Sequence, residues 1–197
     1  MKLSLQSKIE TMRNLTVFNN VSLDGYFTDQ NNDMSWAHVN DPEWLEFTSQ
    51  NAKGESEFLF GRVTYDMMAS FWPTPMAKEN LPQVARAMNE STKYVFSRSR
   101  NKLEWENAKL VKGDLVSEVK KMKDQSGPGI MIFGSGTIIS QLTDAGLIDE
   151  YQIVVHPIIL GAGRTMFDGV KNKIRLKRTQ AREFKNGNVM GWYQIAK

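Results

Sequence analysis

The stretch IMIFGSGTII at residues 130–139 is the most constraining feature of this chain, because an apolar run breaks at Gly-Ser-Gly and resumes at once. Four consecutive apolar residues suit a strand that is covered on both faces. The apolar residues after the break recur at helical spacing, which predicts a short helix over residues 137–145. Gly-Ser-Gly is then a strand-to-helix turn. Such a turn is either simply tight, or it brings free backbone N–H groups close to a ligand such as a phosphate.

Two further apolar runs end in the same way. Phe60 is followed by GRVT at residues 61–64, and Phe96 is followed by SRS at residues 97–99. If these strands are parallel, all three ends lie on one edge of a sheet, where open α/β sheets bind their ligands. That edge would carry two arginines, several hydroxyls and two helix N-termini, which suits a dinucleotide with an additional phosphate. The G-x-G-x-x-G and G-x-x-x-x-G-K-[ST] motifs are absent, so we expect a different nucleotide-binding architecture.

Apolar periodicity along the chain predicts an alternation of strands and helices. Strands are expected at 15–21, 58–60, 93–96, 110–111, 130–133 and 151–156, and helices near 41–52, 65–70, 80–89, 115–123 and 137–145. Residues 22–27 are predicted to turn and residues 28–35 to form a polar loop. The last two strands, about 174–185 and 188–196, should form a hairpin at Asn186-Gly187. This order predicts an α/β protein with a mostly parallel sheet and an antiparallel edge.

The length of 197 residues fits one domain with a substantial core. We expect residues 1–12 to be an N-terminal extension, with Met12 as a possible natural start, and residues 13–197 to be the domain. The alternative is an ordered N-terminal arm that packs on the domain.

Composition restricts the function classes. The chain has no cysteine, which excludes disulfides, thiolate nucleophiles and Cys-based zinc sites, and two histidines are too few to indicate a metal site. The net charge of +3 would help to attract an anion but does not indicate a nucleic-acid partner. No apolar run approaches the roughly 20 residues that span a bilayer, and no secretory signal is evident, so we expect no membrane partner and a cytoplasmic location.

Five segments occur in a fixed order: VSLDGYF at 21–27, FLFGRVTYDMM at 58–68, VFSRS at 95–99, IMIFGSGTIISQL at 130–142 and HPIILGAGRTMF at 156–167. Together they resemble the dihydrofolate reductase superfamily. The greatest likeness is to single-domain bacterial members similar to the reductase domain of riboflavin biosynthesis, the RibD C-terminal domain. The resemblance implies a dihydrofolate-reductase-like fold, with a central mostly parallel sheet, helices on both faces and a C-terminal antiparallel hairpin. It also implies NADPH as the hydride donor.

Cofactor-binding residues are implied by the same resemblance. Gly61, Arg62 and Thr64 match the family motif that meets the cofactor phosphates. Ser97, Arg98 and Ser99 match the segment near the adenosine 2′-phosphate. The family's glycine turn at the pyrophosphate corresponds here to Gly134, Ser135, Gly136, Thr137 and Ile138.

Two carboxylates are candidates for the residue that supports protonation of the substrate. The resemblance places Asp41 at the carboxylate position of dihydrofolate reductases, although Asp41-Pro42 also has the sequence of a plain helix N-cap. Asp24 lies in a segment that the riboflavin branch places beside cofactor and substrate, and its sequence also suits an Asp-Gly turn. Trp36 and Trp44 are candidate walls of a planar substrate pocket, and core packing is the competing interpretation for such aromatics.

The expected activity is NADPH-dependent reduction of a small heteroaromatic substrate of pteridine or pyrimidine type, as in dihydrofolate reductase or 5-amino-6-(5-phosphoribosylamino)uracil reductase. The alternatives are a regulatory protein of the same fold without turnover, and a flavin- or nucleotide-binding module with different chemistry. The zinc deaminase signatures and the folate-type P-W-x-L-P motif are missing, so neither known substrate is supported residue by residue. We also expect a homodimer, with the C-terminal hairpin and residues 156–167 near the interface.

Overall fold

A computed structural model describes residues 12–38, 40–52 and 54–196. The expectation for residues 1–11 of the N-terminal extension lies outside the described residues. Within the described ranges, no helix combines the length and the apolar composition that crossing a membrane requires.

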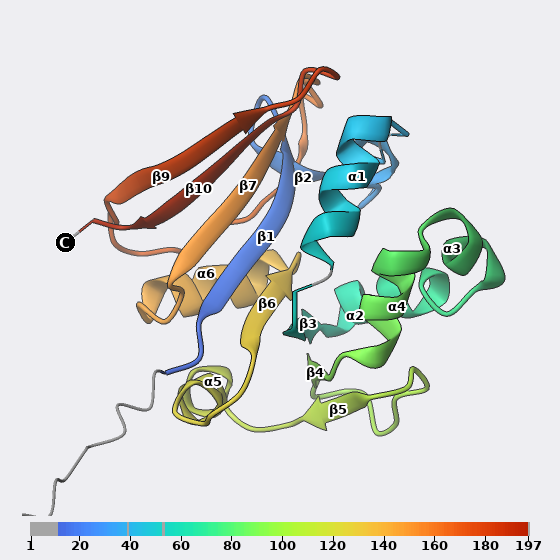
Figure 1. Cartoon of the computed structure of the whole chain (residues 1–197). Helices are drawn as coiled ribbons and strands as arrows, with labels where there is room; N and C mark the ends of the chain where they lie inside the picture. Colours follow the sequence, from blue (N-terminus) through green and yellow to red (C-terminus); the bar gives the residue numbers. More distant parts are fainter. Residues whose placement is uncertain (1–11, 39, 53, 197) are drawn as a thin grey trace, which may run out of the picture.

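A single eight-stranded sheet organises the chain (Figure 1). Its strand order is β5-β4-β3-β6-β1-β7-β10-β9. The first six strands in this order are parallel to one another, and β10 is antiparallel to both β7 and β9. The bounds are β1 Leu15–Ser22, β3 Ser56–Gly61, β4 Lys93–Phe96, β5 Ala108–Val111, β6 Gly129–Phe133, β7 Glu150–His156, β9 Leu176–Glu183 and β10 Val189–Ile195. The predicted α/β class, the mostly parallel sheet and the C-terminal antiparallel hairpin are confirmed.

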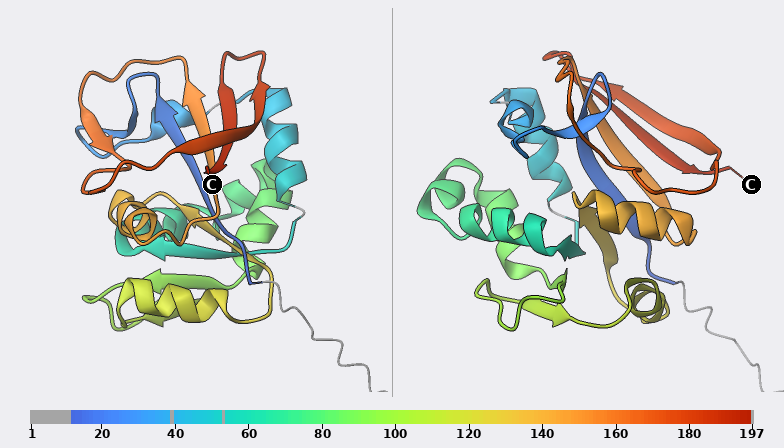
Figure 2. Two further views of the ribbon diagram at one scale, coloured as in Figure 1. Left: turned by 90° about the vertical axis from the view of Figure 1, so that its left-hand side faces the viewer. Right: turned by 180° about the vertical axis from the view of Figure 1, so that it is seen from behind.

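Helices cover both faces of the sheet, as Figure 2 shows. On one face lie α5 (Leu115–Lys123) and α6 (Gly136–Asp144). Their apolar side chains, Val119 and Leu142 among them, form the main core with Leu15 and Val17 of β1. On the other face lie α1 (Pro42–Asn51), α2 (Arg62–Phe71) and α4 (Pro82–Glu90), with α3 (Pro75–Asn80) beside α4.

The second face is packed as two separate clusters. Under α2 and α4, Tyr65 and Met88 pack with Phe60 of β3. Under α1, Trp44 and Phe47 pack with side chains from β7, β10 and the hairpin: Val154, Met190 and Phe184. Between these clusters lie β6 and β1, the middle strands of the sheet.

One sequence prediction was wrong, and one helix was not predicted. Residues 22–35 were expected to be a turn and a polar loop, but Tyr26–Asp29 forms β2, which pairs with β8 (Gly163–Thr165) in a small antiparallel sheet. The partner strand is distant in sequence and only three residues long, so no local sequence pattern predicts the pairing. The helix expected over 80–89 is α4 and is confirmed, but α3 before it was not predicted; Pro82 cannot continue the hydrogen bonding of α3 and starts α4.

Candidate functional site

The ends of β3 and β6 meet at the carboxyl edge of the sheet, as the sequence predicted. A methyl group on Gly61 would overlap Ser135 Oγ and lie 3.1 Å from Ser135 Cβ. A methyl group on Gly134 would lie 3.1 Å from Thr64 Oγ1. The start of α2 and the β6–α6 turn are therefore in direct contact, and the glycines permit that approach.

The β6–α6 turn has an unusual backbone. Gly134 and Ser135 both have positive φ, +56° and +62°. The amides of Ile138 and Ile139 donate to Ser135 O, which leaves the amides of Gly136 and Thr137 ahead of the first intrahelical bond. Successive backbone N–H groups in a turn of this kind form a concavity that suits an anion.

The helix N-termini fall into two groups. Asp41, Thr74 and Asp114 cap α1, α3 and α5 by accepting a backbone N–H. At α2, α4 and α6, the described residues provide no side-chain cap, and of these three helices α2 and α6 start at the shared edge, with Gly61 and Ser135 as their N-cap residues. The two helices that begin at the shared edge thus keep their N-terminal amides available for a ligand.

Arginines surround the start of α2. Asp66 Oδ1 accepts a hydrogen bond from Arg100 Nη2 at 2.6 Å, and Asp66 Oδ2 lies 3.4 Å from Arg62 Nη1. Ser97 is buried, and its Oγ accepts the amide N–H of Arg100 at 3.1 Å. Arg98 and Ser99 are exposed at the same strand end. Arg100 was missed by the sequence reasoning, although the repeat S-R-S-R at 97–100 carried the signal.

Asp24 is an exposed side chain that holds a distant loop. Its Oδ1 and Oδ2 accept the amides of Leu160 and Gly161 at 3.1 and 2.7 Å. A hydrogen bond from the Ser22 hydroxyl and these two amides keep the pKa of Asp24 below its ordinary value. Because both oxygens of this ionised carboxylate are engaged by backbone amides, Asp24 holds the loop at residues 160–161.

Asp41 is the N-cap of α1: its Oδ1 accepts the Trp44 amide at 2.9 Å. The capping interpretation is confirmed, and it engages only one of the two carboxylate oxygens. α1 follows β1 and β2 in the chain and leads back to the start of β3, so its first turn lies at the carboxyl end of β1 (Figure 1).

The two candidate tryptophans lie in different surroundings. Trp44 is 8% exposed and packs against Phe47 and Phe184, with ring centroids 5.6 and 5.0 Å away. It is therefore part of the core under α1. Trp36 is half-buried, and its indole meets the imidazole of His156 edge-on at 5.4 Å.

His156 and Asn20 form a polar pair that the sequence reasoning did not assign to the site. His156, at the end of β7, is 2% exposed, and its Nε2 lies 2.9 Å from Asn20 Oδ1 on β1. Burial lowers the pKa of His156 to about 4, so the ring is neutral near pH 7. The signal in the sequence was Asn19-Asn20, which interrupts an otherwise apolar strand.

Acid should destabilise the protein through His156. The unfolded chain keeps the ordinary pKa of 6.5, whereas the folded pKa is about 4. Between these values the unfolded chain binds a proton that the folded protein does not, so the free energy of unfolding falls as the pH drops from 6.5 to about 4. At about 1.4 kcal/mol per pKa unit, we expect a loss of about 3 kcal/mol. Urea unfolding at a series of pH values measures it.

The two histidines provide matched variants for this measurement. His156→Gln should lose this component of the pH dependence, and His38→Gln, at an exposed position, should keep it. Parallel pH profiles for the wild type and His156→Gln would contradict the assignment.

A family model of the RibD C-terminal domain matches residues 13–190 of this chain. The chain belongs to the RibD C-terminal domain family. Uncharacterized protein YyaP of Bacillus subtilis (strain 168) is 29% identical over 171 residues, covering 86% of this chain and 88% of YyaP. The match to the family model places the chain in a family of reductases.

Solved structures support the dihydrofolate-reductase-like fold of this RibD C-terminal domain. A protein from Shewanella sp. PV-4, named for riboflavin biosynthesis, superimposes with a TM-score of 0.72 at 22% identity, covering 93% of this chain and 99% of that one. Dihydrofolate reductase from Enterococcus faecalis, complexed with NADP(H) and RAB-propyl, gives a TM-score of 0.63 at 14% identity, covering 93% and 97%. The predicted fold family is confirmed.

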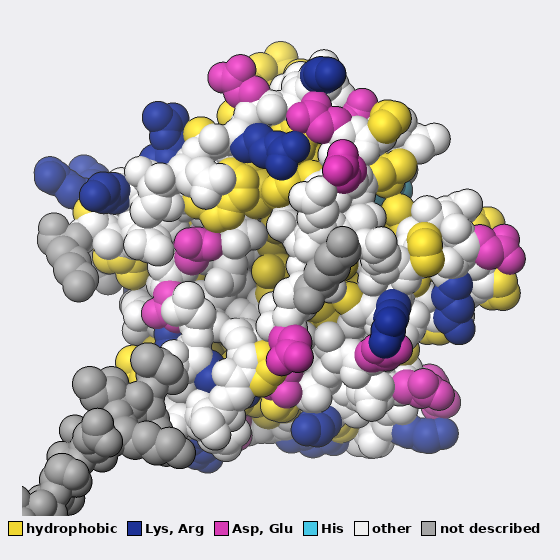
Figure 3. Space-filling view, in the orientation of Figure 1, with side chains coloured by type: hydrophobic (Ala, Val, Ile, Leu, Met, Phe, Trp, Pro, Cys, Tyr) yellow, Lys and Arg dark blue, Asp and Glu magenta, His cyan; other side chains and the backbone are white. Residues whose placement is uncertain are grey.

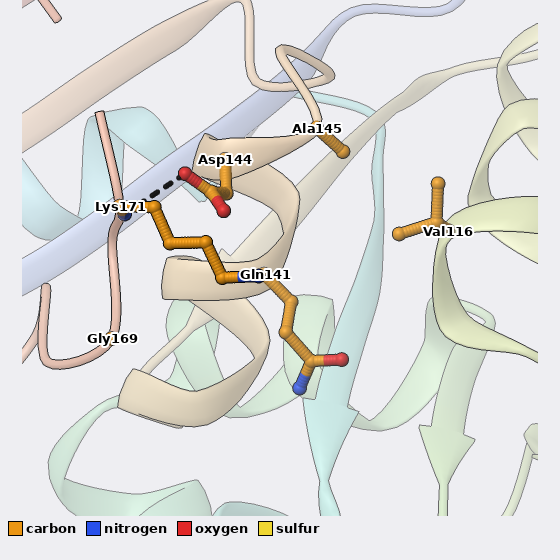
Figure 4. A pocket seen from close by; sticks show the side chains of 6 residues that line it. All are labelled: Val116, Gln141, Asp144, Ala145, Gly169 and Lys171. Atoms are coloured by element: carbon orange, nitrogen blue, oxygen red, sulfur yellow. Dashed lines mark hydrogen bonds between the residues drawn. The ribbon is translucent and has the colours of Figure 1, made fainter. Parts of the chain in front are cut away.

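Two surface hollows differ in their relation to the carboxyl edge of this RibD C-terminal domain. One, of about 240 Å³, is lined by Tyr65, Asp66 and Arg100 among others, and lies between α2 and the segment that follows β4. The other, of about 340 Å³, lies between Val116 of α5 and the C-terminal part of α6, where Asp144 accepts the Lys171 amide (Figure 4). Because this second hollow is at the opposite end of α6 from the β6–α6 turn, it does not belong to the candidate site.

Proposed function

We propose that this protein is an NADPH-dependent reductase of a small heteroaromatic compound of pteridine or pyrimidine type. The observation that carries the proposal is the meeting of two helix N-termini without side-chain caps, those of α2 and α6, at one edge of the sheet. Backbone amides at such a junction suit a pyrophosphate. Membership of a family of reductases supports the same conclusion.

The residues at the edge fit NADPH. In this proposal the pyrophosphate is held by Gly61 at the end of β3, by Thr64 of α2 and by residues 134–138 at the β6–α6 turn, since the glycines allow a backbone to approach closely. The 2′-phosphate would be surrounded by Arg62, Arg98 and Arg100, together with Ser97 and Ser99. The bound cofactor would supply the hydride.

Protonation of the substrate needs a group of this chain or a water that it orders. Both oxygens of Asp24 accept backbone amides, whereas Asp41, among the described residues, accepts one amide, through Oδ1. Asp41 therefore keeps Oδ2 for a proton or an ordered water. We assign Asp41 the proton-supporting role and Asp24 the role of holding the loop at residues 160–161.

NADPH should bind more tightly than NADH. Each hydrogen-bonded contact between an arginine and the 2′-phosphate is worth roughly 1.5–3 kcal/mol, or about tenfold to a hundredfold in affinity. Titration calorimetry with both cofactors measures the ratio of the two affinities. Arg98→Ala and Arg100→Ala should each reduce this ratio. Arg86→Ala, at an exposed pair on α4, is the control. Equal affinity of the wild type for both cofactors would contradict the proposal.

We also propose that the protein forms a homodimer. Along β9 only Arg182 is half-buried and the other residues are exposed, and Ile159 and Leu23 present 70% and 65% of their surface to solvent. Lysine and arginine side chains lie over β9, as Figure 3 shows. Light scattering at micromolar concentration should give twice the 22.5 kDa chain mass, and the monomer mass would exclude this arrangement.

A further inference from the structure

We propose that Asn20, held in place by His156, is a specificity-determining residue that donates a hydrogen bond to a carbonyl oxygen of the substrate. This inference rests on the proposed function, and it names the residue that would bind the polar end of the substrate in the same site. It is carried by three observations: the surface on which Asn20 lies, the orientation of its amide, and the packing behind it.

Asn20 lies on a strip of the sheet between the two helix-covered clusters. Phe18 and Asn20 of β1 point to the same side, because side chains alternate along a strand. Phe18 pairs in register with Phe133 of β6, and their ring centroids are 5.7 Å apart. We call Phe18, Asn20 and Phe133 the central strip. All three are only half-buried, although they lie on the two middle strands of an eight-stranded sheet.

The amide of Asn20 has a defined orientation. Its Oδ1 faces His156 Nε2 at 2.9 Å. An amide oxygen can only accept, so Nε2 carries the proton and donates. The Nδ2 group of Asn20, with two N–H donors, is thereby directed away from His156. Since Asn20 is half-buried, this donor group is accessible at the end of the central strip.

His156 is itself held rigidly. It is 2% exposed, and Trp36 packs edge-on against its ring at 5.4 Å. A buried, packed donor prevents the Asn20 amide from turning over and presenting its oxygen to the substrate. His156 is therefore a positioning residue, and Asn20 makes the contact.

The chemistry of the central strip indicates its ligand. Two aromatic rings provide an apolar surface for a flat heterocycle. One fixed donor at the end of that surface favours a ring that carries a carbonyl group there. If the ring carried an amino group at the same place, this donor would face the Nδ2 donor of Asn20, and neither would have a hydrogen-bond partner.

A pair of pyrimidines tests this assignment. We would titrate the wild type, saturated with NADP⁺, with 5,6-diaminouracil and with 2,4,5,6-tetraaminopyrimidine at pH 8 by calorimetry. The second probe has amino groups where the first has carbonyl groups. The wild type should bind 5,6-diaminouracil about tenfold more tightly, because one hydrogen bond is gained and one mismatch avoided.

Two substitutions with the same change of charge separate the contact from a general effect. Asn20→Asp replaces the donor by an acceptor, so this variant should bind 2,4,5,6-tetraaminopyrimidine about tenfold more tightly than 5,6-diaminouracil. Asn172→Asp makes the same chemical change in an exposed loop and should keep the wild-type preference. An unchanged preference in Asn20→Asp would overturn the proposal.

Variants of His156 test the positioning role. His156→Phe keeps an aromatic ring against Trp36 but removes the donor, so the ratio of the two probe affinities should approach one. His156→Gln keeps a donor and should restore part of the ratio. A structural role alone would weaken both probes equally and leave their ratio unchanged, which would contradict the positioning role.

The remaining outcomes separate this inference from the function on which it rests. Binding of NADP⁺ with no binding of either pyrimidine, or with equal binding of both, would overturn the inference and leave the proposed function standing. A failure of NADP⁺ itself to bind would overturn both.

Discussion

Asp41→Asn is expected to lower kcat by about 10²–10⁴-fold, the usual contribution of a positioned acid or base. Asparagine caps a helix as well as aspartate does, so α1 and the thermal stability should be preserved. The variant nevertheless loses the carboxylate oxygen Oδ2 that the Trp44 amide leaves free. Single-turnover and steady-state kinetics measure the effect with whichever substrate a screen of dihydrofolate, pterins and aminopyrimidines identifies.

Asp24→Asn is the matched comparison for this experiment. Both oxygens of Asp24 hold the backbone at 160–161. Its loss should therefore weaken NADPH binding, measured as Kd, more than it changes kcat. If both variants retain the wild-type kcat and pH profile, neither carboxylate supports protonation and that part of the proposed function fails.

Gly61→Ala should weaken NADPH binding by about a hundredfold. The added methyl group would overlap Ser135 Oγ, and it would lie 3.3 Å from Ile138 Cδ1. The start of α2 and the β6–α6 turn would have to separate, which would misplace backbone amides from both helices. Each hydrogen bond to a charged phosphate is worth roughly 1.5–3 kcal/mol, so the loss of one or two is enough for the expected effect. Calorimetry with NADPH measures it, and circular dichroism checks that the variant is folded.

A second substitution distinguishes this mechanism from misfolding. Ser135 is the residue with which the methyl group would collide, and it has a positive φ of +62° that glycine adopts readily. The double variant Gly61→Ala/Ser135→Gly should recover most of the NADPH affinity, while Ser135→Gly alone should remain near the wild type. If Ser135→Gly gives no rescue, the contact between α2 and the β6–α6 turn is not what the cofactor site requires.

The elements that the sequence predicted well are those whose cause is local. Apolar runs and helical spacing predicted the parallel strands and the helices, because burial on a sheet or under a helix imposes a period on nearby residues. Asp41-Pro42 predicted the start of α1, and Asn186-Gly187 predicted the β9–β10 hairpin, where Gly187 has a φ of +90°. The glycine- and hydroxyl-rich ends of β3, β4 and β6 could be placed on one edge once those strands were taken as parallel.

The features that only the tertiary structure decided depend on contacts between distant residues. Asn20 and His156 are 136 positions apart, and Arg100 and Asp66 are 34 apart. The burial of Trp44 depends on Phe184 from the hairpin.

The amino-acid sequence alone was enough to predict the α/β fold and to place three glycine- and hydroxyl-rich strand ends at one edge of the sheet. The packing of strands and helices decided which polar groups lie at the central strip and which tryptophan remains half-buried. Local sequence periodicity does not predict this packing. Side-chain burial and hydrogen-bond pairing arise only when those elements come together.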